Sequence, residues 1–153
     1  MGRAIGVILV MCIAILPSCR KSPSALLEEE FELAQGAELN TQIRDLKEKL
    51  AEARDDSERA LIHAKIALLQ NAKGDIASST ASAREAVKFQ PNLYMPHYLL
   101  GKSYLEAGRY DEAAASLQRS LELNEGYAPA WFETGNAYYK KGDYARAVRH
   151  YEK

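Results

Sequence analysis

Residues 131–151 read WFETGNAYYKKGDYARAVRHY, and a related pattern occurs earlier, where residues 97–117 read HYLLGKSYLEAGRYDEAAASL. Two glycines, two tyrosines and one alanine coincide when the two stretches are aligned. A fainter third copy lies one period further back, around Gly74. Self-similarity at a fixed period of about 34 residues indicates an array of stacked repeats, in which each unit contacts its neighbours.

The repeated residues predict how each unit folds. Gly101 and Gly135 have no side chain, so a second helix can approach the first one closely at these positions. Gly74, Gly108 and Gly142 are expected to end the first helix of each unit in a left-handed conformation. No segment alternates like a strand, and the expected helices span 57–72, 75–89, 94–107, 110–123, 128–141 and 144–153. The predicted fold class is all-α.

This pattern resembles the tetratricopeptide repeat, a helix–turn–helix unit with the same period. In the copy that matches best, Trp131, Gly135 and Tyr138 stand at consensus positions. The resemblance implies an α-solenoid with a degenerate repeat at 60–93, a second repeat at 94–127 and a truncated third repeat at 128–153.

The segment 26–58 is rich in Glu, Leu, Ala and Lys, and we expect it to form one amphipathic helix before the repeats. Apolar residues at spacings of three and four form a stripe along it: Leu39, Ile43, Leu46, Leu50 and Ala53. The stripe could pack on the following helix pair or form a coiled coil, and its length of two heptads favours the helix pair. Residues 22–60 hold eleven Asp and Glu against five Lys and Arg, which we interpret as a solvated acidic face.

The amino terminus has the character of a targeting segment. Arg3 is followed by an apolar run over residues 4–16, which is too short to span a bilayer as a helix. The next residues, Leu16-Pro17-Ser18-Cys19, resemble the lipobox of bacterial lipoproteins. The resemblance implies a signal peptide over 1–18, acylation of Cys19 with fatty acids such as palmitate, and a lipidated tether over 19–25. An ordinary secretory signal and an uncleaved anchor are the alternatives.

Two further features concern the compartment. Cys12 would leave with the signal, so Cys19 is the sole cysteine of the mature protein, and acylation explains a single cysteine in an exported protein. Arg20 follows Cys19, where Asp would imply retention in the inner membrane. We therefore expect a membrane-anchored lipoprotein that faces the periplasm from the outer membrane.

The sequence offers no set of residues for catalysis. It contains no Gly-rich phosphate loop, no nucleophile elbow and no metal-binding Cys or His motif. His63 and His97 lie one repeat apart without a third ligand, so we interpret them as packing residues, and His150 is expected to be exposed. The net charge of −1 gives no reason to expect nucleic acid as a partner. We expect a protein that is not an enzyme and that holds no metal or cofactor.

In the resembling family, the first helix of each repeat lines a concave groove that binds other proteins. The groove-lining positions here carry aromatic, aliphatic, amide and cationic side chains: Tyr98, Lys102, Leu105, Phe132, Asn136, Tyr139 and Lys140. Such a strip suits an extended or helical peptide. The expected function is a membrane-anchored, non-catalytic scaffold for protein–protein interaction in the bacterial envelope, serving secretion, assembly or export. The alternatives are an N-terminal fragment of a larger repeat protein with a catalytic or transport domain, and a structural spacer.

The last expected helix stops at the twenty-sixth position of its repeat. Its outer residues, among them Val148 and Tyr151, would ordinarily be covered by a following helix, because a stack of repeats needs a polar terminal cap. We therefore expect further sequence after Lys153 or a homodimer that buries this face.

Overall fold

The computed structural model describes the backbone of residues 23–153 and the side chains from Gln35 onward. The expected signal peptide, residues 1–18, and Cys19 lie outside the described residues. The protein divides into two compact units, Met1–Ala37 and Glu38–Lys153. The second unit contains all of the repeats.

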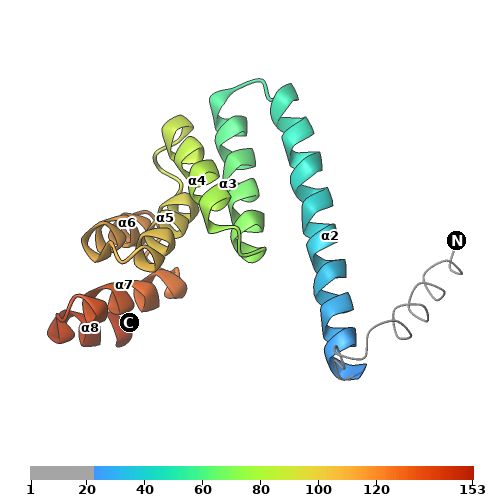
Figure 1. The fold of residues 1–153 in the computed structure, drawn as a ribbon. Helices are drawn as coiled ribbons and strands as arrows, with labels where there is room; N and C mark the ends of the chain where they lie inside the picture. Colours follow the sequence, from blue (N-terminus) through green and yellow to red (C-terminus); the bar gives the residue numbers. More distant parts are fainter. Residues whose placement is uncertain (1–22) are drawn as a thin grey trace, which may run out of the picture. The chain divides into compact units, whose positions relative to one another are not determined.

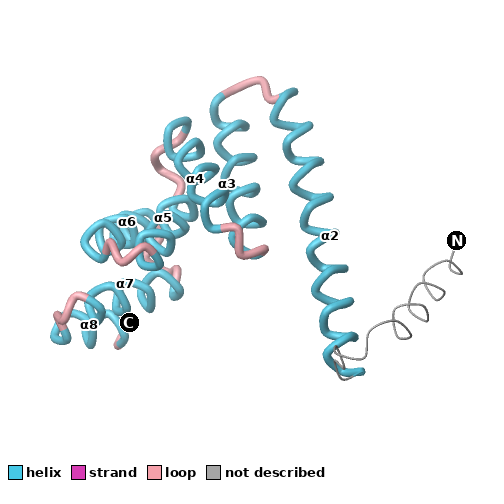
Figure 2. Tube along the Cα trace, in the orientation of Figure 1, coloured by secondary structure: helices cyan, strands magenta, loops and turns pink. Residues whose placement is uncertain are grey.

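Seven α-helices and the turns between them make up residues 23–153, and none of these residues forms a strand (Figure 2). The helices are α2 (Pro23–Glu52), α3 (Asp56–Ala72), α4 (Ile76–Phe89), α5 (Tyr94–Glu106), α6 (Tyr110–Leu123), α7 (Ala128–Lys140) and α8 (Tyr144–Tyr151) (Figure 1). All six predicted repeat helices are present, and their ends lie close to the predicted ends. The all-α prediction is confirmed.

The boundary between α2 and α3 differs from the prediction. The sequence predicts an amphipathic segment over 26–58 and a first repeat helix from residue 57, and the structure separates the two, because α2 ends at Glu52 and α3 begins at Asp56. The Asp55 carboxylate accepts a hydrogen bond from the backbone N–H of Glu58 at 2.8 Å. The Glu58 carboxylate in turn accepts one from the backbone N–H of Arg54 at 2.9 Å. These two bonds satisfy amide groups at the start of α3 and begin a new helix there.

A glycine with a left-handed backbone forms the turn inside each repeat. The φ angles are 82° at Gly74, 72° at Gly108 and 85° at Gly142, a region in which an L side chain would be strained. At the middle turn, the N–H of Arg109 donates to the carbonyl of Tyr104 at 2.9 Å, which satisfies a carbonyl at the end of α5. The prediction for these three glycines is confirmed.

Successive repeats share a core. Each second helix lies against the first helix of the next repeat, so α4 contacts α5 and α6 contacts α7. One buried cluster consists of Ala67, Ala83, Leu99 and Leu100, and another of Ala113, Ala114, Leu117, Ala137, Tyr138 and Ala147. The first helices also touch one another, because α3 contacts α5 and α5 contacts α7. These three helices therefore share one surface.

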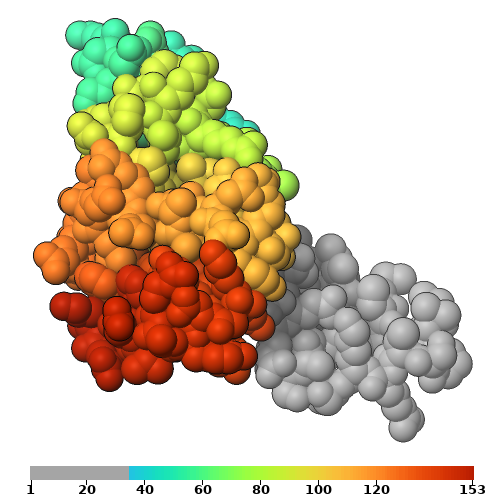
Figure 3. Space-filling model, turned by 90° about the vertical axis from the view of Figure 1, so that its left-hand side faces the viewer, coloured from blue at the N-terminus to red at the C-terminus, as the bar shows by residue number. Residues whose placement is uncertain are grey.

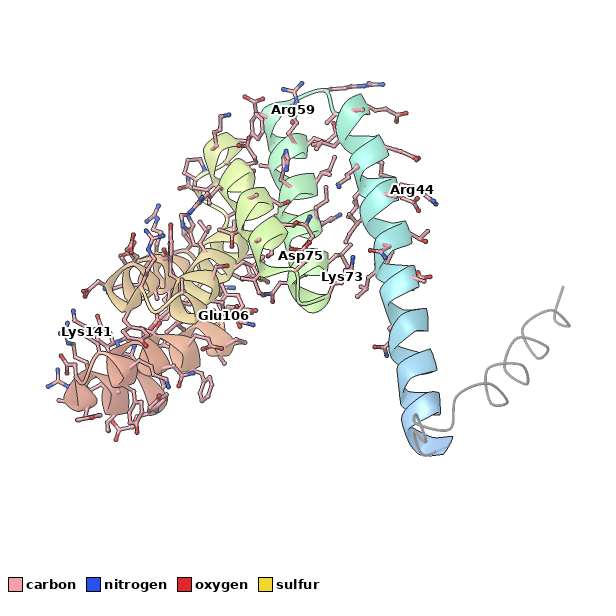
Figure 4. All side chains as sticks on the ribbon, in the orientation of Figure 1. Arg44, Arg59, Lys73, Asp75, Glu106 and Lys141 are labelled. Carbon is pink, nitrogen blue, oxygen red and sulfur yellow. The ribbon has the colours of Figure 1, made fainter. Side chains whose placement is uncertain are left out.

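The second half of α2, from residue 38 onward, packs against α3. Ile43 forms a buried cluster with Ile62 and Ile66 of α3, which confirms that the apolar stripe packs on the following helix pair. At the other end of α3, the Lys73 ammonium donates to the Asn40 side-chain oxygen at 2.7 Å (Figure 4). This half of α2 therefore covers the side of α3 that a preceding repeat would otherwise cover.

Candidate functional site

The seven residues predicted to bind a partner lie on two neighbouring first helices. Helix α5 carries Tyr98, Lys102 and Leu105, and helix α7 carries Phe132, Asn136, Tyr139 and Lys140. Helix α3 also contacts α5 and extends the same surface. We call the surface formed by α3, α5 and α7 the first-helix face.

Tyr98 and Leu105 take part in the packing between repeats. The Tyr98 ring meets the Tyr127 ring edge-on, with 5.0 Å between the centroids. Burial, with smaller contributions from Tyr127 and Glu133, raises the pKa of Tyr98 to about 12. Leu105 packs against the core cluster of α6 and α7. Both side chains are half-buried, because the following repeat packs on part of each of them.

Lys102 and Asn136 are half-buried polar residues with partners inside the protein. The Lys102 ammonium lies 3.5 Å from the side-chain oxygen of Asn71 on α3. The Asn136 amide donates to the Glu133 carboxylate at 3.0 Å, and its oxygen accepts a hydrogen bond from the Tyr151 hydroxyl at 2.8 Å. These contacts hold the amide in one orientation, so a ligand would have to replace them to bind it.

Phe132, Tyr139 and Lys140 are exposed on α7. The two aromatic rings contact rings of α8: Phe132 lies 5.8 Å from Tyr151, and Tyr139 lies 5.4 Å from Tyr144, between centroids. The aromatic residues of α7 therefore join an exposed surface that continues onto the last helix.

Two exposed leucines on α3 complete the first-helix face. Leu61 and Leu68 are two helical turns apart, so both lie on the same side of the helix. Each borders an open hollow between α2 and α3, of about 760 Å³ beside Leu61 and about 370 Å³ beside Leu68. Lys49 and Lys65 line both hollows. Leu61 and Leu68 precede Met95 and Lys102 by 34 residues, the length of one repeat. The repeat alignment, extended to the first repeat, could therefore have identified both leucines as surface residues of this face.

His63 and His97 both have contacts within the protein. The His63 ring stacks on Phe89 at 5.8 Å, and burial lowers its pKa, although Glu85 opposes that shift. The His97 ring nitrogen lies 2.9 Å from the Pro91 carbonyl oxygen. Within the part of the sequence that the structure describes, no three His, Cys, Asp or Glu residues lie close enough to hold a metal ion.

His150 is half-buried, which corrects the expectation that it is exposed. Its ring lies 5.4 Å from Trp131 and 5.3 Å from Tyr138, both on α7. Burial, and to a smaller extent the Arg146 cation, lowers the pKa of His150. The side chain therefore helps to hold α8 on α7.

Residues 98–153, which comprise most of α5 and all of α6, α7 and α8, match the family model of the tetratricopeptide repeat. Residues 98–153 therefore contain tetratricopeptide repeats. A second family model, that of the C-terminal domain of the ATP synthase epsilon subunit, matches residues 36–83. Its match ends inside α4, so its limits do not follow those of a helix pair. No curated protein matches the sequence.

Several solved structures of tetratricopeptide-repeat type are similar in fold. A crystal structure of MamA has a TM-score of 0.67 and 19% sequence identity, and the match covers 88% of this protein and 73% of MamA. The second TPR of Spaghetti (RPAP3), bound to the HSP90 peptide SRMEEVD, has a TM-score of 0.57 and 16% identity over 61% of this protein and 86% of that one. The globular C-terminal domain of P. aeruginosa LpoP has a TM-score of 0.53 and 27% identity over 61% and 92%.

Considered over residues 23–153, no helix is both long enough and apolar enough to cross a membrane.

Proposed function

We propose that this protein is a membrane-tethered, non-catalytic scaffold that binds a segment of another protein on its first-helix face. The observation that carries the proposal is the exposure of Leu61 and Leu68, on one side of α3, beside the two hollows that α3 forms with α2. Two leucines separated by two helical turns form an apolar strip that water solvates poorly, and such strips are characteristic of protein-binding surfaces.

The surroundings of the leucines favour one class of partner. Lys49 and Lys65 line both hollows, together with Glu52, Asp55 and Glu58 in one hollow and Asp45 in the other, and Lys102 lies on the neighbouring helix α5. The apolar strip of Leu61 and Leu68 can hold apolar anchors of a peptide, and acidic residues of that peptide can pair with the lysines. The fold comparison supports this class of partner, because the RPAP3 repeats hold the peptide SRMEEVD, which contains three acidic residues.

The tether is proposed from the sequence. The lipobox-like Leu16-Pro17-Ser18-Cys19 provides an acylation site at Cys19, and Arg20 favours the outer membrane over the inner one. Two or more acyl chains on one cysteine would give lasting attachment to a membrane, whereas a single acyl group would not. The scaffold would then present its partner at the periplasmic surface of the bacterial envelope.

Peptide selection tests the binding site. The full-length protein is exposed to a random peptide library, and the enriched peptides are measured against Leu61→Glu/Leu68→Glu and against the control Ala81→Glu, which adds a carboxylate to the exposed face of α4. We expect acidic peptides with apolar anchors, and affinity that falls roughly tenfold or more in the leucine variant and stays unchanged in the control. If selection enriches no related peptides, or if the leucine variant binds as well as wild type, the protein is better explained as a structural spacer.

Metabolic labelling with a fatty acid tests the tether. Wild-type protein expressed in a Gram-negative host is expected to incorporate the label and to fractionate with the outer membrane. Cys19→Ser should incorporate none and should accumulate as an uncleaved or soluble precursor, because the acceptor sulfur is absent. A wild-type protein that carries no label but still fractionates with membranes would disprove the lipid anchor.

A further inference from the structure

One acidic residue of the first-helix face is half-buried and has no cation beside it. Among the acidic residues at positions 94–151, only Glu133 and Asp143 are half-buried, and the others are exposed. Asp143 pairs with Arg146, whereas Glu133, on α7, forms no ion pair with any described residue. A carboxylate that has lost part of its water shell without gaining a counter-charge is stabilised by a cation that a partner brings. Glu133 is therefore a candidate for such a contact.

Hydrogen bonds hold the Glu133 carboxylate in place. It accepts a hydrogen bond from the Asn136 amide at 3.0 Å, and the Asn136 oxygen accepts one from the Tyr151 hydroxyl at 2.8 Å. After burial and the neighbouring tyrosines, the charge of Glu133 is a further cause of the raised pKa of Tyr98 and of Tyr151. The carboxylate thus lies near two phenol rings, and a Lys or Arg side chain that pairs with it can also contact aromatic surface.

The repeat register shows that packing does not require a carboxylate at this position. The equivalent residue of α5 is Leu99, which is 1% exposed and belongs to the buried cluster with Ala67 and Ala83. The equivalent residue of α3 is Lys65, which is exposed. One repeat position therefore carries a cation on α3, a buried leucine on α5 and an anion on α7. Packing accepts a leucine here, so packing does not account for the charge of Glu133.

Lys102 provides the opposite charge on the neighbouring first helix. Its ammonium lies 3.5 Å from the Asn71 side-chain oxygen, and it forms no ion pair with Glu133 or with any other described acid. Figure 3 shows the repeats as successive layers, with α7 and α8 in red beside α5 and α6 in yellow and orange. Neighbouring packed helices lie about 10 Å apart, and an extended chain rises about 3.3 Å per residue. A peptide that crosses from α5 to α7 would therefore meet Lys102 and Glu133 with residues about three positions apart.

We propose that the first-helix face requires a basic residue, Lys or Arg, in the segment that it binds, and that Glu133 pairs with this residue. An acidic residue about three positions away along the same segment would pair with Lys102. The inference rests on the proposed function, which places a peptide on this face, and adds a second charge and its spacing. The partner is then a segment with charges of both signs rather than a wholly acidic one.

Selection from a random peptide library tests this requirement. The full wild-type protein should enrich peptides in which a Lys or Arg lies about three positions from an Asp or Glu. Glu133→Gln keeps an oxygen that can accept the hydrogen bond from Asn136, and it should retain the apolar and acidic residues but lose the enrichment of Lys and Arg. Glu133→Lys should enrich Asp or Glu at the basic position instead. Glu85→Gln, which changes a half-buried acid on α4, is the control and should enrich the same peptides as wild type.

Affinities measured with the strongest selected peptide separate a binding role of Glu133 from a structural one. Replacing the basic residue of this peptide by norleucine should weaken its binding to wild type roughly tenfold or more. The same replacement should have little effect on its binding to Glu133→Gln, because the carboxylate is absent. A structural role of Glu133 would instead weaken the binding of both peptides alike. Circular dichroism confirms that each variant is folded.

Three results would overturn the proposal. Wild type could enrich peptides without basic residues, Glu133→Gln could keep the preference for them, or the norleucine peptide could bind wild type as tightly as its parent. Selection that enriches no related peptides, or a Leu61→Glu/Leu68→Glu variant that binds as well as wild type, would overturn the proposed function and this inference with it. The two failures are therefore distinguishable.

Discussion

Gly101 and Gly135 occupy the same position in successive repeats, but the side chains that contact them differ in their ability to move. A Cβ atom added at Gly101 would collide with the Leu117 side chain and would lie 3.3 Å from the Ala113 carbonyl oxygen. One added at Gly135 would collide with the Tyr151 ring. Leu117 is fully buried and cannot move without disturbing the core, whereas the exposed Tyr151 can swing toward solvent.

The two Gly→Ala substitutions should therefore have different effects. Gly101→Ala is expected to destabilise the protein by about 1–3 kcal/mol, because the core around Leu117 becomes overpacked. The free energy of unfolding of Gly135→Ala is expected to lie within about 1 kcal/mol of the wild-type value, because the higher helix propensity of alanine offsets the cost of displacing Tyr151. Urea unfolding followed by circular dichroism measures both values. Equal destabilisation, or the reverse order, would show that Tyr151 is held as firmly as Leu117.

At the scale of elements, α8 is the shortest helix described, and a few side chains hold it. The Asp143 carboxylate accepts a hydrogen bond from the backbone N–H of Arg146 at 3.0 Å and so caps its start. The His150 ring lies between Trp131 and Tyr138, and its Nδ1 is buried without a hydrogen-bond partner. The neutral ring suits this site better than the cation does, which agrees with the lowered pKa of His150.

The attachment of α8 is expected to weaken in mild acid. Because the pKa of His150 is lower in the folded protein than in the unfolded one, the unfolded state takes up the proton first as the pH falls. The stability contribution is present above the ordinary histidine pKa of about 6.5 and is lost as the pH falls through the folded value. The unfolding free energy of wild type should fall between about pH 7.5 and about pH 5.5. His150→Phe keeps a ring in place but cannot take up the proton, so its unfolding free energy should fall less over the same range. The pKa of His63 is lowered as well, so some dependence of the unfolding free energy on pH should remain in both wild type and His150→Phe. An unchanged slope in His150→Phe would contradict this account.

At the scale of the whole molecule, the repeats form a series of nearest neighbours. Helix α3 contacts α4 and α5, and α5 contacts α6 and α7, but α3 makes no comparable contact with α6, α7 or α8. The second half of α2 covers one side of this stack through Ile43, Ile62 and Ile66. Stability in such an array is close to a sum of local terms, so damage at one end need not spread to the other.

Ile66→Ala should consequently act locally. Ile66 is almost fully buried, so its truncation is expected to cost about 2–5 kcal/mol. Hydrogen exchange should accelerate in residues 38–72 and remain close to wild type in α6 and α7. Leu61→Ala, on the exposed side of the same helix, is the control and should change neither region. Uniform acceleration along the sequence would show that all repeats unfold as one unit.

The sequence alone determined the helices and the turns, because local chemistry decides both. Gly74, Gly108 and Gly142 permit a left-handed turn whatever packs around them, and the apolar spacing of each helix can be read without knowing its neighbour. The surface that is free to bind was decided only by tertiary structure. Tyr98 and Phe132 share one repeat position, yet the first is packed under the next repeat and the second is exposed. The physical reason is that burial depends on what lies opposite a side chain, and a repeated sequence assigns the same residue class to a covered position and to an open one.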